Sequence, residues 1–215
     1  MSDLSAAHRP LAEAAGVAAA MVVFALFAHS PMPESLLAAA ALLVAGIIGF
    51  RSLRAAATPA DILGFSKITW KVGAFLAAGG VLGAALAVLF RMRSGAGAAP
   101  TGLAAFAVVA AAIGGAEEIL YRGYVQGRLR ALGPVAAVAL AAAGHTAYKS
   151  ALFVWPPEGV AIDFAFLVAA TFLGGLVFGA LRELSRSVWP PLAAHVAFDL
   201  MVYGDWSQAP WWVWA

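Results

Sequence analysis

The 215-residue chain contains no cysteine, which excludes disulfide bonds, thiolate chemistry and cysteine-ligated metals. Charged residues are also scarce: they make up 11% of the chain, less than half of their usual share in soluble domains. Hydrophobic residues account for 63%, and the mean hydropathy is +0.89. This composition excludes an ordinary soluble domain and predicts an all-α, polytopic transmembrane helical bundle in the cell membrane.

Several common functional motifs are absent as well. The chain has no His-Glu-x-x-His zinc motif, no Gly-x-Ser-x-Gly serine motif and no phosphate-binding loop. Its formal charge of +2 comes from basic residues scattered between apolar segments, so we expect a lipid bilayer around the protein and no nucleic-acid partner. Residues 1–10 are polar, include Asp3 and show no distinct cleavage site, and therefore resemble a cytoplasmic leader more than a signal peptide.

The remaining sequence divides into apolar segments separated by proline, glycine and charged residues. We expect about seven spans, N-terminal helices in 1–100, a catalytic core in 101–203 and a Trp-rich tail in 204–215 at the outer interface, all in one structural domain. The mixed polar and apolar segment 56–69 suits an interfacial helix. Glycines four residues apart are expected to let helices pack closely: Gly79 and Gly83, and Gly175 and Gly179. The predicted spans are residues 11–29, 34–50, 70–90, 101–121, 134–153, 162–181 and 189–203.

The distribution of basic residues predicts the orientation of these spans. With the N-terminus inside, only Arg91 and Arg93 fall in outer loops, and Lys149 lies within a span. Because cytoplasmic loops carry the excess of Lys and Arg, we expect a cytoplasmic N-terminus and an outer C-terminus. The ten basic residues on the predicted inner side are Arg9, Arg51, Arg54, Lys67, Lys71, Arg122, Arg128, Arg130, Arg182 and Arg186.

Two adjacent glutamates interrupt the fourth apolar segment. Glu118 and Arg122 are four residues apart on a helix, so they can form an ion pair that offsets their burial. Glu117 points about 100° away from Glu118 and has no cationic partner on its own helix. An unpaired carboxylate in a poorly solvated pocket suits general-base work on water. The alternative is that all three residues lie in the cytoplasmic headgroup zone as a solvated helix end.

Two later segments carry further polar residues. His145 lies about 16 Å into the fifth span by helical rise, and the neighbouring Tyr148 and Lys149 imply a polar cavity nearby. His195 and Asp199 lie on one face of the last span. Asp199 can fix the tautomer of the imidazole, or both residues can bind a substrate carbonyl. In the alternative interpretation, these residues are hydrogen-bonding pairs that hold the bundle together.

Ionised groups inside a membrane cost at least about 2.5–3.5 kcal/mol each, so polar residues on three helices indicate a membrane-embedded active site. A glutamate, two histidines and an aspartate can deprotonate water and stabilise an oxyanion, which amide hydrolysis requires. We expect no cofactor. If zinc is present, its ligands would be Glu117, His145 and His195.

The order of these residues resembles a known family. Glu117-Glu118-x-x-x-Arg122-Gly, a following helix with His145, and His195-x-x-x-Asp199 are similar to the three motifs of the CPBP intramembrane proteases, which include CAAX endopeptidases and bacterial Abi proteins. The resemblance covers about residues 101–200.

The resemblance implies that Glu117 and His145 activate water, that His195 and Asp199 form the oxyanion site, and that Glu118 and Arg122 hold the motif helix. It favours a glutamic over a zinc mechanism, because it assigns His195 to the oxyanion. Ala141 and Asp199 stand where the family usually has Phe and often has Asn. An aspartate can donate to an oxyanion only when it is protonated.

We therefore predict an intramembrane endopeptidase that acts on a peptide or protein substrate, either membrane-associated or with a C-terminal tail. The sequence carries no signal for the oligomeric state, neither for a monomer nor for an oligomer. The rival interpretation is a non-catalytic immunity or scaffold protein, or a proton-coupled transporter. A carrier needs polar groups on both sides of the midplane, whereas we expect them here in the cytoplasmic half.

Overall fold

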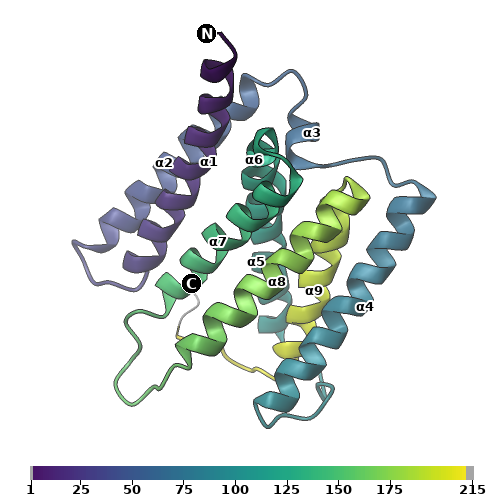
Figure 1. The fold of residues 1–215 in the computed structure, drawn as a ribbon. Helices are drawn as coiled ribbons and strands as arrows, with labels where there is room; N and C mark the ends of the chain where they lie inside the picture. The colour runs from purple at the N-terminus through teal and green to yellow at the C-terminus, as the bar shows by residue number, and fades with distance from the viewer. Residues whose placement is uncertain (1, 212–215) are drawn as a thin grey trace.

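The structure is a computed structural model that describes residues 2–211 and, from residue 8 onward, also their side chains. The described chain is helical and contains no strand. Seven helices correspond to the seven predicted apolar segments and run alternately up and down, as Figure 1 shows. They are α1 (Ser2–Phe27), α2 (Ser35–Arg54), α4 (Trp70–Arg93), α5 (Ala105–Glu118), α7 (Pro134–Leu152), α8 (Phe164–Ser185) and α9 (Trp189–Val202).

Four of these helices, α1, α2, α4 and α8, are long and apolar enough to cross a membrane. At 14 residues each, α5 and α9 are only about 21 Å long, shorter than the roughly 30 Å hydrocarbon core. The 19-residue helix α7 is long enough, but its polar residues lower its mean hydropathy, so it is not among the four. The helical bundle is confirmed, and the number of seven spans stays a prediction.

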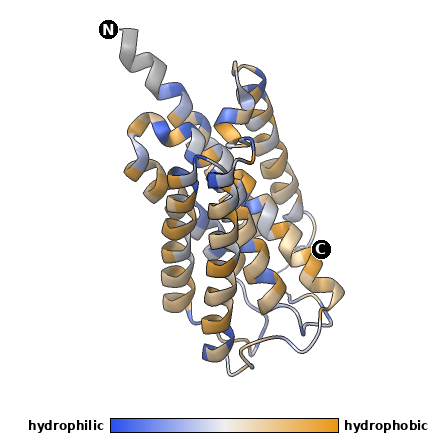
Figure 2. Cartoon of the chain, turned by 90° about the vertical axis from the view of Figure 1, so that its right-hand side faces the viewer, coloured by the Kyte–Doolittle hydropathy of each residue, from blue (hydrophilic) through white to orange (hydrophobic). Residues whose placement is uncertain are grey.

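The outer faces of the helices are apolar. Figure 2 shows hydrophobic residues along the middle of the helices and hydrophilic residues mainly near their ends. Leu43, Val81 and Leu173 are among the many exposed apolar side chains. A surface this apolar fits contact with lipid rather than with water.

Local sequence signals set the helix ends. The Thr69 hydroxyl accepts a hydrogen bond from the backbone N–H of Val72 at the start of α4. The Asp163 carboxylate accepts one from the N–H of Phe166 at the start of α8. Proline occupies the first turn of both α7 and α9, where its missing N–H costs no hydrogen bond.

The predicted interfacial helix at 56–69 is much shorter in the structure. Only α3 (Pro59–Leu63) is helical, because Gly64 ends it in the left-handed conformation with φ 75°. The backbone of α3 packs closely against Gly127, where only glycine leaves enough room: a Cβ at Gly127 would lie 3.0 Å from the carbonyl carbon of Ile62. The segment is therefore docked on the bundle.

The two glycine pairs that were predicted to allow close helix packing do lie at helix–helix contacts. A Cβ at Gly83 would lie 2.6 Å from the carbonyl carbon of Ala194, and one at Gly79 would lie 3.1 Å from that of Pro190. These glycines join α4 to α9. Gly175 and Gly179 join α8 to α7 in the same way, where Cβ atoms would meet Ala142 and Val138. Both pairs bring the polar helix α9 or α7 close to an apolar neighbour.

Arg91 is not in a loop but is buried in the last turn of α4. Its guanidinium donates to the carbonyls of Gly97, Ala99 and Met201, and to the Asp205 carboxylate at 2.8 Å. Hydrogen bonds from Thr101 and then Arg91 lower the pKa of Asp205 from 3.8 to about 2. Arg91 therefore ties the loop after α4 to the chain that follows α9.

The tail lies beside the loops at the same end of the bundle. Trp211 makes an edge contact with Phe153 after α7 and with His29 after α1, at ring distances of 5.7 Å and 6.1 Å. This is the end predicted to face outward. The tail residues Trp212 and Trp214 lie outside the described residues.

Candidate active site

Glu117 and Glu118 form the last turn of α5 and are buried, with 5% and 0% of their surfaces exposed. The helix continues without a break into a π-helical segment, η1 (Ile119–Val125), which contains Arg122. The π-turn is wider than an α-turn, and such turns are frequent at functional sites. This burial excludes a solvated helix end in the headgroup zone.

The predicted pair between Glu118 and Arg122 is confirmed. Arg122 Nη1 donates to Glu118 Oε1 at 3.0 Å, and both side chains are completely buried. The same Nη1 contacts His145 Nδ1 at 2.8 Å. Because arginine can only donate, Nδ1 of His145 is the acceptor and the ring proton lies on Nε2. Arg122 therefore fixes the tautomer of His145.

Glu117 is not unpaired, contrary to the sequence prediction. His145 Nε2 lies 3.2 Å from Glu117 Oε2, and Lys149 Nζ lies 2.6 Å from Oε1. Lys149 is one turn beyond His145 on α7, a different helix, so the pattern within the first motif could not reveal it. The ammonium takes up one lone pair of Oε1, and a carboxylate oxygen has a second lone pair that can accept another hydrogen bond. The carboxylate thus keeps a free acceptor beside a positive charge.

Asp199 does not fix the tautomer of His195. His195 Nδ1 bonds Glu118 Oε1 at 2.8 Å, whereas Nε2 lies 3.7 Å from Asp199 Oδ2, beyond hydrogen-bond distance. Since the buried carboxylate of Glu118 accepts, Nδ1 of His195 carries a proton. Glu118 therefore orients His195 and Arg122 together, which leaves Nε2 of His195 facing Asp199.

These contacts form one continuous polar chain through four elements. It runs from Glu117 through His145, Arg122 and Glu118 to His195. All six predicted site residues meet in this region of the bundle, with Asp199 at its edge. The structure brings together α5, η1, α7 and α9, which are separated in sequence by up to about 80 residues.

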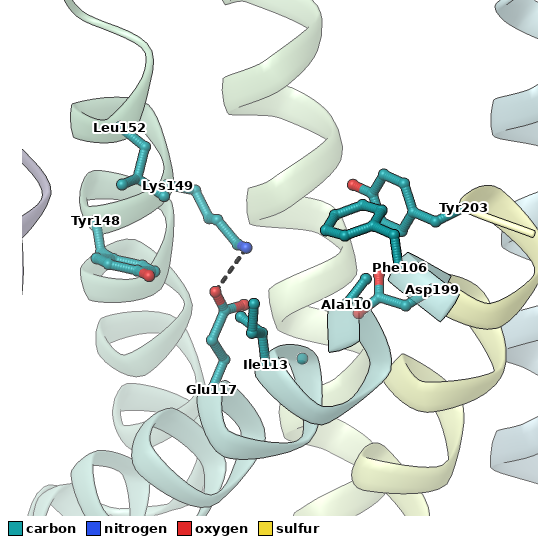
Figure 3. A pocket seen from close by; sticks show the side chains of 10 residues that line it. Phe106, Ala110, Ile113, Glu117, Tyr148, Lys149, Leu152, Asp199 and Tyr203 are labelled. Atoms are coloured by element: carbon teal, nitrogen blue, oxygen red, sulfur yellow. Dashed lines mark ion pairs between the residues drawn. The ribbon is translucent and has the colours of Figure 1, made fainter. Parts of the chain in front are cut away.

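A small cavity opens beside this chain, as the presence of Tyr148 and Lys149 predicted. It has a volume of about 30 Å³, enough for one or two water molecules but not for a peptide. Figure 3 shows Glu117 and Lys149 on one side, and Phe106, Asp199 and Tyr203 on the other.

The position of the cavity corrects one expectation. Phe106 lies near the start of α5, and the polar lining residues Lys149 and Asp199 lie in the last turns of α7 and α9. These ends lie opposite the end predicted to be cytoplasmic. Polar groups are therefore not confined to the cytoplasmic half, and their distribution does not separate an enzyme from a carrier.

Aromatic rings stack on His145 and hold it in place, a contact that the sequence did not predict. Tyr121 stacks on the imidazole with a ring distance of 4.6 Å, and Tyr148 lies nearly parallel to it at 6.2 Å. Both tyrosines are buried. The only sequence signal was their proximity to Glu117 and His145.

The residues as arranged do not form a zinc site. Both ring nitrogens of His145 have partners, and Nδ1 of His195 points to Glu118 rather than to Glu117. The ammonium of Lys149 also occupies the approach to Glu117 Oε1, where it would repel a metal ion. Among residues with described side chains, no three His, Asp or Glu converge as metal ligands.

A known protein family matches the region of the sequence that contains the polar chain. Residues 97–201 match the family described as Rce1-like, type II CAAX prenyl endopeptidase Rce1-like. This match confirms the resemblance to CPBP/CAAX proteases, and it supports a CAAX-type intramembrane endopeptidase in general. No curated protein and no solved structure matches the chain.

Proposed function

We propose that this protein is an intramembrane endopeptidase in which Glu117 is the general base that activates water. One observation carries the proposal: the buried Glu117 carboxylate lines a cavity of water size, and its Oε1, which pairs with Lys149, has a second lone pair for a water molecule. A water molecule in this cavity can donate to Oε1 and be deprotonated as it attacks a peptide carbonyl. The family match independently supports peptide hydrolysis in a membrane.

The remaining residues have distinct roles in this mechanism. His145 donates from Nε2 to Glu117 Oε2 and so keeps Oε1 directed at the water. The oxygen of water bonds to the carbonyl carbon, and the carbonyl oxygen becomes an oxyanion. His195 can donate to that oxyanion from Nε2 when both of its ring nitrogens are protonated, a form that the carboxylates of Glu118 and Asp199 stabilise.

Collapse of the tetrahedral intermediate breaks the carbon–nitrogen bond. The proton that Glu117 took from water is transferred to the leaving amine, which restores the carboxylate. Asp199 lies against His195 and adjusts its position rather than its tautomer. The substrate is a membrane-associated peptide or a C-terminal tail, and entry requires the residues around the small cavity to move apart.

Metal-free catalysis is part of this proposal, because Lys149 rather than a metal ion supplies positive charge to Glu117. The test is to treat purified protein with a chelator and then measure both zinc content and cleavage. We expect cleavage to survive. Stoichiometric zinc that restores activity to stripped protein would contradict the glutamic mechanism.

We also propose that the N-terminal end of the bundle is cytoplasmic. The ten basic residues on the predicted inner side belong to elements that meet at or toward this end in Figure 1. Reporter fusions at Gly95 and at the C-terminus should both report the outer side. A cytoplasmic signal at either position would contradict this orientation.

The experiment for the function itself is cleavage in a membrane. Purified protein is reconstituted in phosphatidylcholine–phosphatidylglycerol liposomes with a farnesylated C-terminal tail peptide, and the products are identified by mass spectrometry. We expect one internal cut with a new carboxyl terminus. A protein that cuts no lipidated or unmodified tail peptide but carries protons across the liposome would instead be a transporter that uses the polar groups on both sides of the midplane.

A further inference from the structure

Lys149 is the residue of the site that the motifs do not include. It lies one turn after His145 on α7, and its ammonium is 2.6 Å from Glu117 Oε1, the contact that Figure 3 marks with a dashed line. Its side chain is 21% exposed and lines the cavity. A lysine inside an apolar bundle is costly, so its position against one carboxylate calls for an explanation.

The other charges around Glu117 are already engaged. Glu118 and Arg122 pair with each other on the same continuous helix, and Glu118 also accepts from His195 of α9. His145 of α7 donates from a ring whose other nitrogen accepts from Arg122 and is therefore neutral. Asp199 of α9 adds negative charge on the far side of the cavity.

Among the described side chains, Lys149 is therefore the fully charged cation that contacts Glu117 directly. A carboxylate oxygen has two lone pairs, so the contact with Lys149 leaves Oε1 able to accept a hydrogen bond from water as well. A cation in this position favours the charged carboxylate without consuming the acceptor that a general base needs.

On the basis of the proposed function, we propose that Lys149 is a positioning residue that holds the Glu117 carboxylate ionised and directed into the cavity. It acts through Glu117 and not on the substrate. A purely structural lysine would instead stabilise the bundle and affect turnover equally at every pH.

The test compares Lys149→Met, which removes the charge, with Lys149→Arg, which keeps it. Lys71→Met is the matched control, because Lys71 is exposed on α4. The kcat for the farnesylated tail peptide is measured in liposomes across the pH range. We expect the acidic limb of the Lys149→Met profile to move up by about 1–3 pH units, with turnover recovering at alkaline pH. Lys149→Arg should keep most of the wild-type profile, and Lys71→Met all of it.

Infrared difference spectra provide a readout that does not depend on turnover. The carboxylic-acid band of Glu117 is assigned in the Lys149→Met background, by its loss in the double variant Glu117→Gln/Lys149→Met. It should be absent from the wild-type protein at neutral pH and present in Lys149→Met. A uniform loss of activity at every pH, or an unchanged Glu117 band in Lys149→Met, would overturn the role of Lys149.

These results separate the two proposals. Full activity in Glu117→Gln would refute the proposed function, while the infrared band would still decide whether Lys149 keeps Glu117 ionised. If Glu117→Gln is inactive and the Lys149→Met profile matches that of the wild-type protein, only the inference about Lys149 fails.

Discussion

Gly114 lies one turn before Glu118 on α5 and leaves room for the polar residues of α9. A Cβ at this position would lie 2.8 Å from His195 Cδ2 and closer still to Asp199 Oδ2. Ordinary carbon contacts begin near 3.4 Å, so His195 must retreat by roughly 0.6 Å or more. Displacements of about 1 Å at a reacting centre cost on the order of 10²-fold in rate. We therefore expect Gly114→Ala to lower kcat by 10- to 100-fold, an order-of-magnitude range.

The cost in stability should be small. The overlapping atoms of Asp199 and His195 belong to the ends of side chains that can move, and alanine is favoured over glycine in a helix by about 0.5–1 kcal/mol. Gly115→Ala is the matched control, because its Cβ would make only ordinary contacts, 3.9 Å from Val196 and 4.0 Å from Leu192. It should keep wild-type activity and melt at the same temperature or higher.

The assay measures peptide cleavage in liposomes together with thermal melting in detergent for both variants. Equal activity of the Gly114→Ala and wild-type proteins would refute the argument that the positions of His195 and Asp199 matter for turnover. Equal losses of activity in the Gly114→Ala and Gly115→Ala variants would show that the site tolerates no change in α5, whatever contacts the new methyl group makes.

Three further predictions concern stability. Gly83→Ala should destabilise the protein by about 1–3 kcal/mol in thermal melts because its Cβ meets the backbone of α9, whereas Gly80→Ala has open space and should be neutral or stabilising. Glu118→Gln leaves a buried arginine without its counter-charge and should cost about 3–5 kcal/mol in denaturant titrations; a loss below about 1 kcal/mol would contradict burial of the pair. Asp205→Asn should lower the melting temperature by an amount that is constant above about pH 5 and shrinks as the pH falls from there through 2, because the hydrogen-bonded carboxylate has a lowered pKa. A difference at pH 2 as large as that at pH 5 would contradict this.

The helical segments of the fold could be predicted from the sequence because apolar runs and their proline and glycine breaks are local signals. All seven predicted segments are helices. The helix predicted at 56–69 is too long, because the left-handed Gly64 ends α3 early and the backbone of Ile62 packs against Gly127 of the bundle. The π-turn after Glu118 also had no sequence signal, because its hydrogen bonds depend on how η1 packs.

In the site, contacts within one helix were predictable and contacts between helices were not. The spacing of Glu118 and Arg122 predicted their ion pair correctly. Lys149 reaches Glu117 from α7, and Glu118 rather than Asp199 holds His195 across from α9. Such pairings depend on the rotation and depth of neighbouring helices, and periodicity within a single segment does not determine these.

The most direct test of the central claim is single-turnover cleavage by Glu117→Gln, which keeps the shape of the side chain but cannot take a proton from water. General-base catalysis contributes about 10²–10⁴-fold, so the rate constant for cleavage should fall by about a hundredfold or more. The double variant Glu117→Gln/Lys149→Met removes both charges of the pair and should restore any lost stability without restoring activity. A Glu117→Gln protein that cleaves at the wild-type rate would contradict the assignment of Glu117 as the base and, with it, this site as the active site.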